Sequence, residues 1–231
     1  MKGALDAKRG KIFAKLAREI TVAAKMGGGD PGMNPRLRMI LLKCRAANMP
    51  AENIDRAIKK GTGGGEGVNF EDLTYEIYGP HGVALLVEVS TDNRNRTAAD
   101  VRSIVTKNNG SIATAGSVSR LFQRKGQIVV SRENASEDKL MEVALEAGAE
   151  DFKTESEGFE ILTEPATFEA VHKKIETAGI KCDAAEIMSL PTITTPLSGS
   201  AAVAAVNKLI DELEDHDDIK EVFSNAEFPD T

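Results

Sequence analysis

Gly61-Thr62-Gly63-Gly64-Gly65 divides this chain of 231 residues into two parts whose sequence patterns differ. Four glycines in five residues make regular structure costly, because glycine loses more conformational freedom on folding than any other residue. We therefore expect a linker at residues 61–65. Before this stretch, apolar residues recur at helical spacing, and Pro35 and Pro50 stand where first-turn prolines are common. The pattern predicts three helices, at residues 8–26, 34–47 and 50–60.

After residue 65 the apolar residues alternate over short runs, which is typical of strands. The sequence predicts, in order, strands at residues 73–78 and 83–90, a polar loop at residues 91–96 and a helix at residues 97–108. The stretch Gln123-Arg124-Lys125-Gly126 predicts the turn of a hairpin between strands at residues 117–122 and 127–131.

The order of elements over residues 128–190 is strand, helix, strand, strand, helix, strand, which is the ferredoxin-like arrangement. A last helix, residues 200–216, and a last strand, residues 219–223, are too little to fold alone. We expect them to complete the sheet that begins at residue 73. The predicted fold class is therefore α+β with three domains: a basic helical domain at residues 1–66, a discontinuous mixed α/β domain at residues 67–130 plus 192–231, and an acidic ferredoxin-like domain inserted at residues 131–191.

The charge of the chain is divided by position. Residues 1–66 hold 14 Lys and Arg against 6 Asp and Glu, whereas the whole chain has a net charge of −7. Residues 133–190 hold 5 basic and 15 acidic residues. Local charge, not net charge, attracts phosphate-bearing partners, so the first segment is expected to face a polyanion. Residues 133–190 therefore repel nucleic acid, and we expect them to face solvent, a basic protein partner or the chain's own N-terminal domain.

Composition excludes several other classes of protein. The two cysteines and three histidines are scattered, so we expect no metal site, no disulfide framework and no cofactor. No apolar run approaches the length of a membrane helix, and we expect a cytoplasmic protein without a membrane partner. No carboxylate pair, Ser/His/Asp order or Cys/His arrangement stands out, so we expect no catalytic residues and no enzyme.

Two groups of cations are candidates for phosphate contacts. On the first helix, basic residues spaced along one sector of the helical wheel would reach successive phosphates, although a solvated polar face has the same pattern. The stretch Asp92-Asn93-Arg94-Asn95-Arg96-Thr97 lies before a helix N-terminus, which favours anions. In the alternative, Asn and Thr cap that helix while the arginines pair with acids of their own domain. The predicted nucleic-acid-binding residues are Lys8, Lys11, Lys15, Arg18, Lys25, Arg36, Arg38, Arg94 and Arg96.

Several segments together resemble one known family. They are Lys2-Gly3-Ala4, Asp6-Ala7-Lys8-Arg9-Gly10-Lys11-Ile12-Phe13, Met26-Gly27-Gly28-Gly29-Asp30-Pro31, Asn34-Pro35-Arg36-Leu37-Arg38, Asn48-Met49-Pro50, Asn53-Ile54, Arg56-Ala57-Ile58-Lys59-Lys60-Gly61-Thr62-Gly63 and Thr91-Asp92-Asn93-Arg94-Asn95-Arg96-Thr97. With them the chain is similar, over essentially its whole length, to the YebC/PmpR family, which includes the mitochondrial translational activator of cytochrome oxidase.

The resemblance implies a three-domain α/β protein of the cytoplasm that regulates gene expression. Members are described as DNA-binding transcriptional regulators, and others act in translation on the ribosome, where relief of stalling has been proposed. Members usually begin with a further basic stretch before Lys-Gly-Ala, whereas Met1 directly precedes Lys2 here. We expect a DNA-binding transcriptional regulator; the alternatives are a translation factor that binds rRNA on the ribosome and an acidic module that docks a basic protein.

Overall fold

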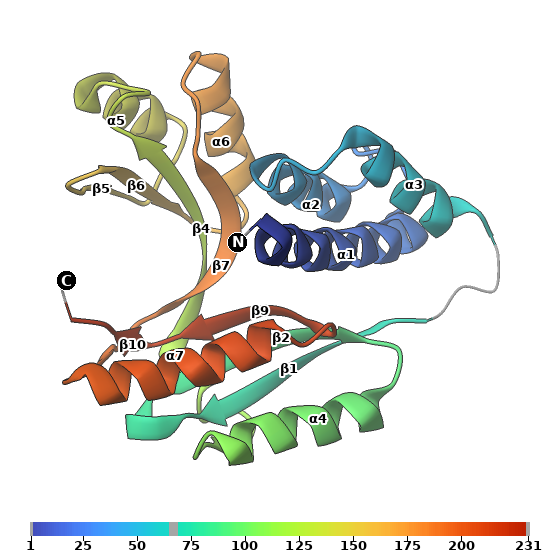
Figure 1. The fold of residues 1–231 in the computed structure, drawn as a ribbon. Helices are drawn as coiled ribbons and strands as arrows, with labels where there is room; N and C mark the ends of the chain where they lie inside the picture. The colour runs from blue at the N-terminus through green and yellow to red at the C-terminus, as the bar shows by residue number, and fades with distance from the viewer. Residues whose placement is uncertain (1, 65–68, 230–231) are drawn as a thin grey trace. The chain divides into compact units, whose positions relative to one another are not determined.

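The computed structural model describes residues 2–64 and 69–229, and these form two compact units (Figure 1). The first unit takes its described residues from 1–37, 50–123 and 190–231, and the second consists of residues 38–49 and 124–189. The predicted α+β class is confirmed, with helices at the N-terminus and mixed elements after them. The predicted three-domain boundaries, at residues 66, 130 and 191, stay a prediction.

Three helices form the N-terminal part, as the proline and apolar spacing predicts: α1 (Lys2–Gly27), α2 (Pro35–Ala46) and α3 (Ala51–Thr62). Helices α1 and α3 pack side by side (Figure 1). Ile20 in α1 is fully buried, and Ala57 is the buried residue of α3. Asn34 caps α2, because its Oδ1 accepts from the N–H of Leu37 at 3.1 Å.

Part of the predicted linker is helical instead. Helix α3 continues through Gly61 and Thr62, and Gly63 forms its C-terminal cap; Gly65 lies outside the described residues. A Cβ on Gly61 would lie 2.5 Å from the backbone oxygen of Thr21 in α1. This glycine therefore allows two helices to approach closely, and a close approach has the same sequence signal as a flexible linker.

The first unit contains a four-stranded sheet in the order β3-β1-β2-β9. Its strands are β1 (Glu71–Tyr78), β2 (Ala84–Thr91), β3 (Ser111–Ile112) and β9 (Ile219–Ser224). Strand β9 pairs antiparallel with β2, which confirms that the end of the chain completes this sheet. Helices α4 (Arg94–Lys107) and α7 (Ser200–Glu214) contact each other and bury Val105 and Leu209 against the strands. The short strands β8 (Thr195–Pro196) and β10 (Ala226–Glu227) pair in parallel. The first unit also contains two 3-10 helices, η1 (Pro80–Gly82) and η2 (Ser119–Leu121).

The predicted polar loop at residues 91–96 is shorter than expected. Helix α4 begins at Arg94, because the side chain of Asn93 accepts from the N–H of Arg96 at 3.0 Å and caps the helix there. Both arginines of this stretch therefore belong to the first turn of α4. The prediction placed the start of this helix, at residue 97, three residues too late.

The second unit has the predicted ferredoxin-like order of elements. They are β4 (Phe122–Ser131), α5 (Glu137–Glu146), β5 (Asp151–Thr154), β6 (Gly158–Thr163), α6 (Phe168–Thr177) and β7 (Ala184–Pro191), with the sheet order β5-β6-β4-β7. The end residues of β4 and β7 belong to the first unit. Helices α5 and α6 lie side by side and bury Leu140 and Phe168 against Ile128 and Ile161 of the sheet (Figure 1).

The predicted hairpin at residues 117–131 is wrong. Residues 119–121 form η2, and a single ten-residue strand, β4, runs through the expected turn. A Cβ on Gly126 would lie 2.3 Å from Oγ1 of Thr163 and 2.4 Å from Cδ2 of Phe168. The glycine that predicted a turn is instead needed for a close contact inside the strand.

Candidate nucleic-acid interface

Cations of helix α1 face a short acidic stretch at the end of helix α7. We define the acidic segment as residues 214–218, which contain Glu214, Asp215, Asp217 and Asp218. Lys11 forms an ion pair with Asp215, and Lys15 donates to the backbone oxygen of Glu214. Burial lowers the pKa of Lys15, and the neighbouring carboxylates of Asp217 and Glu214 oppose that shift. The polar face that sequence periodicity assigned to solvent or phosphate therefore meets acids of the same chain.

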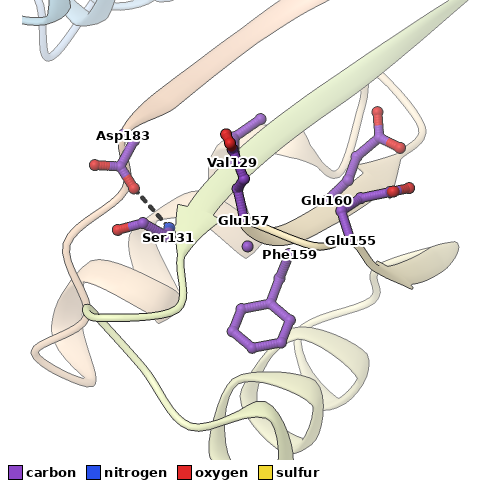
Figure 2. Close-up of a pocket in the computed structure, with 8 residues that line it drawn as sticks. Val129, Ser131, Glu155, Glu157, Phe159, Glu160 and Asp183 are labelled. Atoms are coloured by element: carbon purple, nitrogen blue, oxygen red, sulfur yellow. Dashed lines mark hydrogen bonds between the residues drawn. The ribbon is translucent and has the colours of Figure 1, made fainter. Parts of the chain in front are cut away.

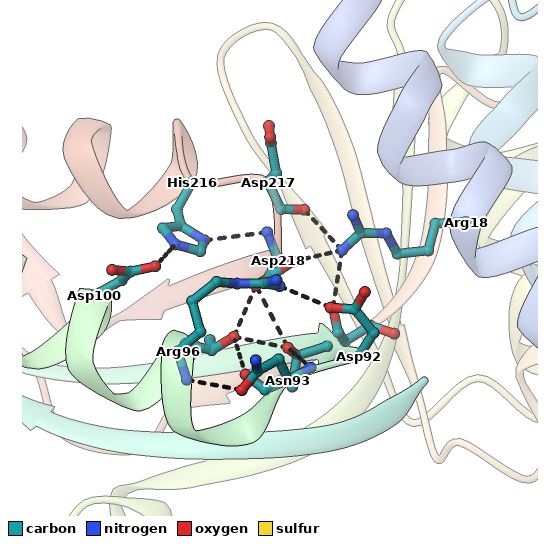
Figure 3. A network of polar contacts seen from close by, with 11 residues as sticks. Arg18, Asp92, Asn93, Arg96, Asp100, His216, Asp217 and Asp218 are labelled. Atoms are coloured by element: carbon teal, nitrogen blue, oxygen red, sulfur yellow. Dashed lines mark hydrogen bonds and ion pairs between the residues drawn. The ribbon is translucent and has the colours of Figure 1, made fainter. Parts of the chain in front are cut away.

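Two arginines from different helices share the buried carboxylate of Asp218 (Figure 3). Arg18 Nη1 lies 2.8 Å from Oδ1, and Arg96 Nη2 lies 3.0 Å from Oδ2. Thr97 Oγ1 donates to the same Oδ2 at 2.7 Å. Burial alone would raise the pKa of Asp218, but these hydrogen bonds and charges outweigh burial and lower it to about 2. Asp218 therefore stays ionised, with a side chain only 4% exposed.

The start of helix α4 is built around the same carboxylate. The N–H of Asn93 donates to Oγ1 of Thr91 at 2.9 Å, which orders the turn before the helix. His216 accepts from the N–H of Asp218 through Nδ1 at 3.1 Å, so Nε2 carries the proton toward Asp100, also at 3.1 Å. Figure 3 shows these side chains gathered from α4 and from the end of α7.

The other predicted residues lie outside this cluster. Four of them have polar partners: Lys25 with Asn69 at 2.8 Å, Arg36 with Asp72 at 2.6 Å, Arg94 with Glu71 at 3.3 Å, and Arg38 with Glu169 at 2.7 Å. Arg38 and Glu169 belong to the second unit. Lys8 is exposed, and its side chain has no ion pair or hydrogen bond within residues 7–64 and 69–229.

The structure thus gathers Lys11, Lys15, Arg18 and Arg96 around the acidic segment, and the charge of Lys8 also acts on Glu214. The other four predicted residues have their partners elsewhere. At residues 93–97 it shows the alternative arrangement, with Asn93 as the cap and the arginines paired with acids of the same unit. Nucleic-acid binding by these nine residues stays a prediction.

The exposed basic face of helix α3 was missed by the selection of site residues. Arg56, Lys59 and Lys60 are exposed and lie three and four positions apart, which puts them on one side of the helix. Arg56 pairs with Glu52, one turn away on the same exposed surface. For Lys59 and Lys60 no side-chain partner is found in the described part of the chain. Their i, i+3, i+4 spacing in the sequence is the signal that would have found them.

A cavity of about 470 Å³ opens in the second unit (Figure 2). Asp183 points at the N–H of Ser131 and accepts its hydrogen bond at 2.7 Å. The ring of Phe159 lies 5.7 Å from that of Phe152 and is almost fully buried. Four carboxylates surround this cavity, those of Glu155, Glu157, Glu160 and Asp183. Carboxylates repel phosphate, so the cavity adds nothing to a nucleic-acid interface.

Metal-binding groups, thiols and membrane-spanning helices were also searched for among the described residues. Within residues 2–64 and 69–229 no group of three or more His, Cys, Asp or Glu is placed to hold a metal ion. Cys44 is buried, and burial together with nearby acids raises the pKa of Cys182 to about 12. Across the same ranges no helix is long and apolar enough to cross a membrane.

Comparison with known proteins identifies the class of protein. A probable transcriptional regulatory protein of Desulforapulum autotrophicum is 56% identical over 229 residues, covering 99% of this chain and 92% of the relative. One of the same description from Geobacillus thermodenitrificans is 54% identical over 228 residues, covering 98% and 92%. The crystal structure of a conserved hypothetical protein from Aquifex aeolicus matches with a TM-score of 0.86 and 45% identity, covering 98% of this chain and 93% of that one.

Family models define the relationship further. Residues 1–64 match the TACO1/YebC protein N-terminal domain, and residues 70–226 match the TACO1/YebC second and third domain. The chain belongs to the TACO1/YebC family, and the resemblance read from the sequence motifs is confirmed.

Proposed function

We propose that this chain is a cytoplasmic, non-enzymatic regulator of gene expression that binds nucleic acid through its N-terminal helices. The observation that carries the proposal is the exposed basic face formed by Arg56, Lys59 and Lys60 on helix α3. The names of the relatives, probable transcriptional regulatory proteins, support the same class of function.

The chemistry of this face favours phosphates as its ligand. Lysine ammonium groups act as point charges on flexible stems, and they neutralise phosphates without reading base edges. Lys59 and Lys60 lie in the last turn of α3, where the helix dipole also favours cations. Binding is therefore expected to depend steeply on salt and weakly on sequence.

Structured RNA is a second candidate ligand, favoured by the same observation. A face made of two lysines and one arginine has few groups for reading bases in the major groove of DNA. Phosphates of an RNA helix offer such a face an equivalent set of contacts. Duplex DNA and ribosomal RNA are therefore compared directly in the test.

The test is salt-dependent binding of labelled duplex DNA, a labelled ribosomal RNA hairpin and whole ribosomes. We expect the double variant Lys59→Glu/Lys60→Glu to weaken binding about tenfold or more and to reduce the salt slope by about one for each lost phosphate contact. The matched control is Lys173→Glu/Lys174→Glu, which reverses two adjacent exposed lysines on helix α6.

The outcomes separate the candidates. Preferred binding to one duplex sequence supports a transcriptional role, whereas co-sedimentation with ribosomes and no preferred duplex supports a translational one. Equal losses from the two double variants would show that only net charge matters and would remove α3 as the contact surface.

A further inference from the structure

The acidic segment lies where negative charge is least favourable for a helix. It includes the last residue of helix α7, Glu214, and the residues after it. The last turn of α7 contains no basic residue, and the helix dipole is negative there. Burial and the neighbouring acids Asp211 and Glu221 raise the pKa of Glu214, as expected in strongly negative surroundings. The acidic segment therefore presents a concentrated negative field to any cation beside it.

Helix α1 places a row of three cations beside the acidic segment. Lys11, Lys15 and Arg18 are four and three positions apart and share one side of the helix. Each meets a different acceptor along the acidic segment: the carboxylate of Asp215, the backbone oxygen of Glu214 and the carboxylate of Asp218. A row of cations facing successive oxygen acceptors is also how a basic helix meets the phosphates of a nucleic acid.

We infer that the acidic segment is a built-in competitor that occupies the cations of helix α1 and limits their contact with nucleic acid. The inference rests on the proposed function, which it deepens by adding regulation. Release of Lys11 and Lys15 from the acidic segment adds cations to those of helix α3 and strengthens binding.

The three contacts differ in how easily they are released. Lys11 and Asp215 keep side-chain exposures of 46% and 68%, so water and salt weaken their attraction. Arg18 meets a carboxylate that is 4% exposed and has Arg96 as a second partner. Arg18 is therefore the fixed end of the contact, and Lys11 is the releasable end. Lys15 is half-buried between them, and the charges of Asp217, Glu214 and Asp215 attract it.

The test removes charge at the releasable end without touching the buried carboxylate. In the variant Asp215→Asn/Asp217→Asn two exposed acids become neutral amides of the same size. We expect binding of a short labelled duplex DNA or RNA hairpin to tighten at least about threefold and the salt slope to steepen by about one to two. The matched control is Glu142→Gln/Glu146→Gln, the same charge change on exposed positions of helix α5.

A second comparison tests the contact itself. The change Asp215→Asn/Asp217→Asn is made again in a chain that already carries Lys11→Gln/Lys15→Gln. There it should tighten binding of the probe no more than Glu142→Gln/Glu146→Gln does, because the cations to be released are gone. Two results would show that the acidic segment is not a competitor. In one, Asp215→Asn/Asp217→Asn increases the affinity of the natural chain no more than the control does; in the other, the larger increase persists without the two lysines.

The inference and the proposed function fail in different ways. If the natural chain binds the probes and Lys59→Glu/Lys60→Glu weakens that binding, the proposed function stands whatever the acidic segment does. If neither the natural chain nor the variant Asp215→Asn/Asp217→Asn binds duplex DNA, RNA hairpin or ribosomes, the proposed function is wrong and the competitor role falls with it.

Discussion

Arg18 in helix α1 and Arg96 in helix α4 donate to different oxygens of the buried carboxylate of Asp218. They come from two stretches that the sequence presents as separate candidate phosphate sites. In the structure they are two parts of one ionic cluster inside the first unit (Figure 3). Their first role is therefore structural, and charge reversal at either arginine would leave a buried carboxylate under-compensated.

We expect Asp218→Asn to destabilise the first unit by about 3 kcal/mol. The neutral amide leaves two arginines without the charge they share, and removing one partner from a buried ionic cluster is strongly destabilising. The free energy of unfolding from urea titration measures the loss. The matched control is Asp217→Asn, since this exposed neighbour meets Arg18 only through its backbone oxygen and should change stability by less than about 0.5 kcal/mol. Equal effects of the two variants would contradict the role given to Asp218.

The carboxylate of Asp218 should also make the free energy of unfolding depend on pH. The pKa of Asp218 is about 2 in the folded chain, below the usual value of about 3.9 expected after unfolding. The ionised group therefore contributes about 2–3 kcal/mol above pH ~5, and that contribution is lost progressively as the pH falls from ~5 through ~2. The stability difference between the natural chain and Asp218→Asn should shrink by that amount over this range. A difference independent of pH would contradict the lowered pKa.

Local patterns predicted most elements of the fold, because helical spacing, strand alternation and capping residues act over a few positions. They placed α2 to within a residue at each end and gave the ferredoxin-like order of the second unit. Glycine misled the prediction twice. Gly61 and Gly126 were read as linker and turn, yet both sit where a Cβ would collide with a neighbouring element. Only the partner across the contact distinguishes these two uses of glycine.

The acids that pair with the candidate cations were the least predictable part of the candidate site. Lys11 and Asp215 are 204 residues apart in the chain, and no local rule connects them. Sequence reasoning did state that the arginines near residue 94 could pair with acids of their own domain. It considered the N-terminal domain as a partner only for the acids of residues 133–190. The acids that helix α1 meets lie at residues 214–218, and that contact depends on how α1 and the end of α7 come together in the first unit.

Gly61→Ala tests the close approach of helices α1 and α3. The new Cβ would lie 2.5 Å from the backbone oxygen of Thr21 and 2.7 Å from Cβ of Ala24, so the helices must shift. We expect a loss of about 1–3 kcal/mol in the free energy of unfolding, since overpacking outweighs the better helix propensity of alanine. Gly10→Ala is the control: nothing lies within 4 Å of its added Cβ, and it should stabilise α1 by about 0.5–1 kcal/mol. Stabilisation by both variants would mean that residue 61 is not a packing contact.

Glu76 on strand β1 should hold the loop before η2 in place. Its carboxylate accepts from the N–H groups of Gly116, Val118 and Ser119, at 2.6, 2.8 and 2.5 Å. Burial alone would raise the pKa of Glu76, but these three hydrogen bonds outweigh burial and lower it.

In Glu76→Gln, one acceptor oxygen becomes an NH₂ group that faces backbone donors. We expect a loss of about 1–3 kcal/mol and faster amide hydrogen exchange at residues 116, 118 and 119. Because the pKa of Glu76 is lowered in the fold, the effect should be full at neutral pH and fade as the pH falls below ~4. Glu71→Gln is the control, since Glu71 lies on the same strand with an exposed side chain that pairs with Arg94, and it should leave those amides unchanged. Unchanged exchange in Glu76→Gln would show that the loop is ordered by its backbone alone.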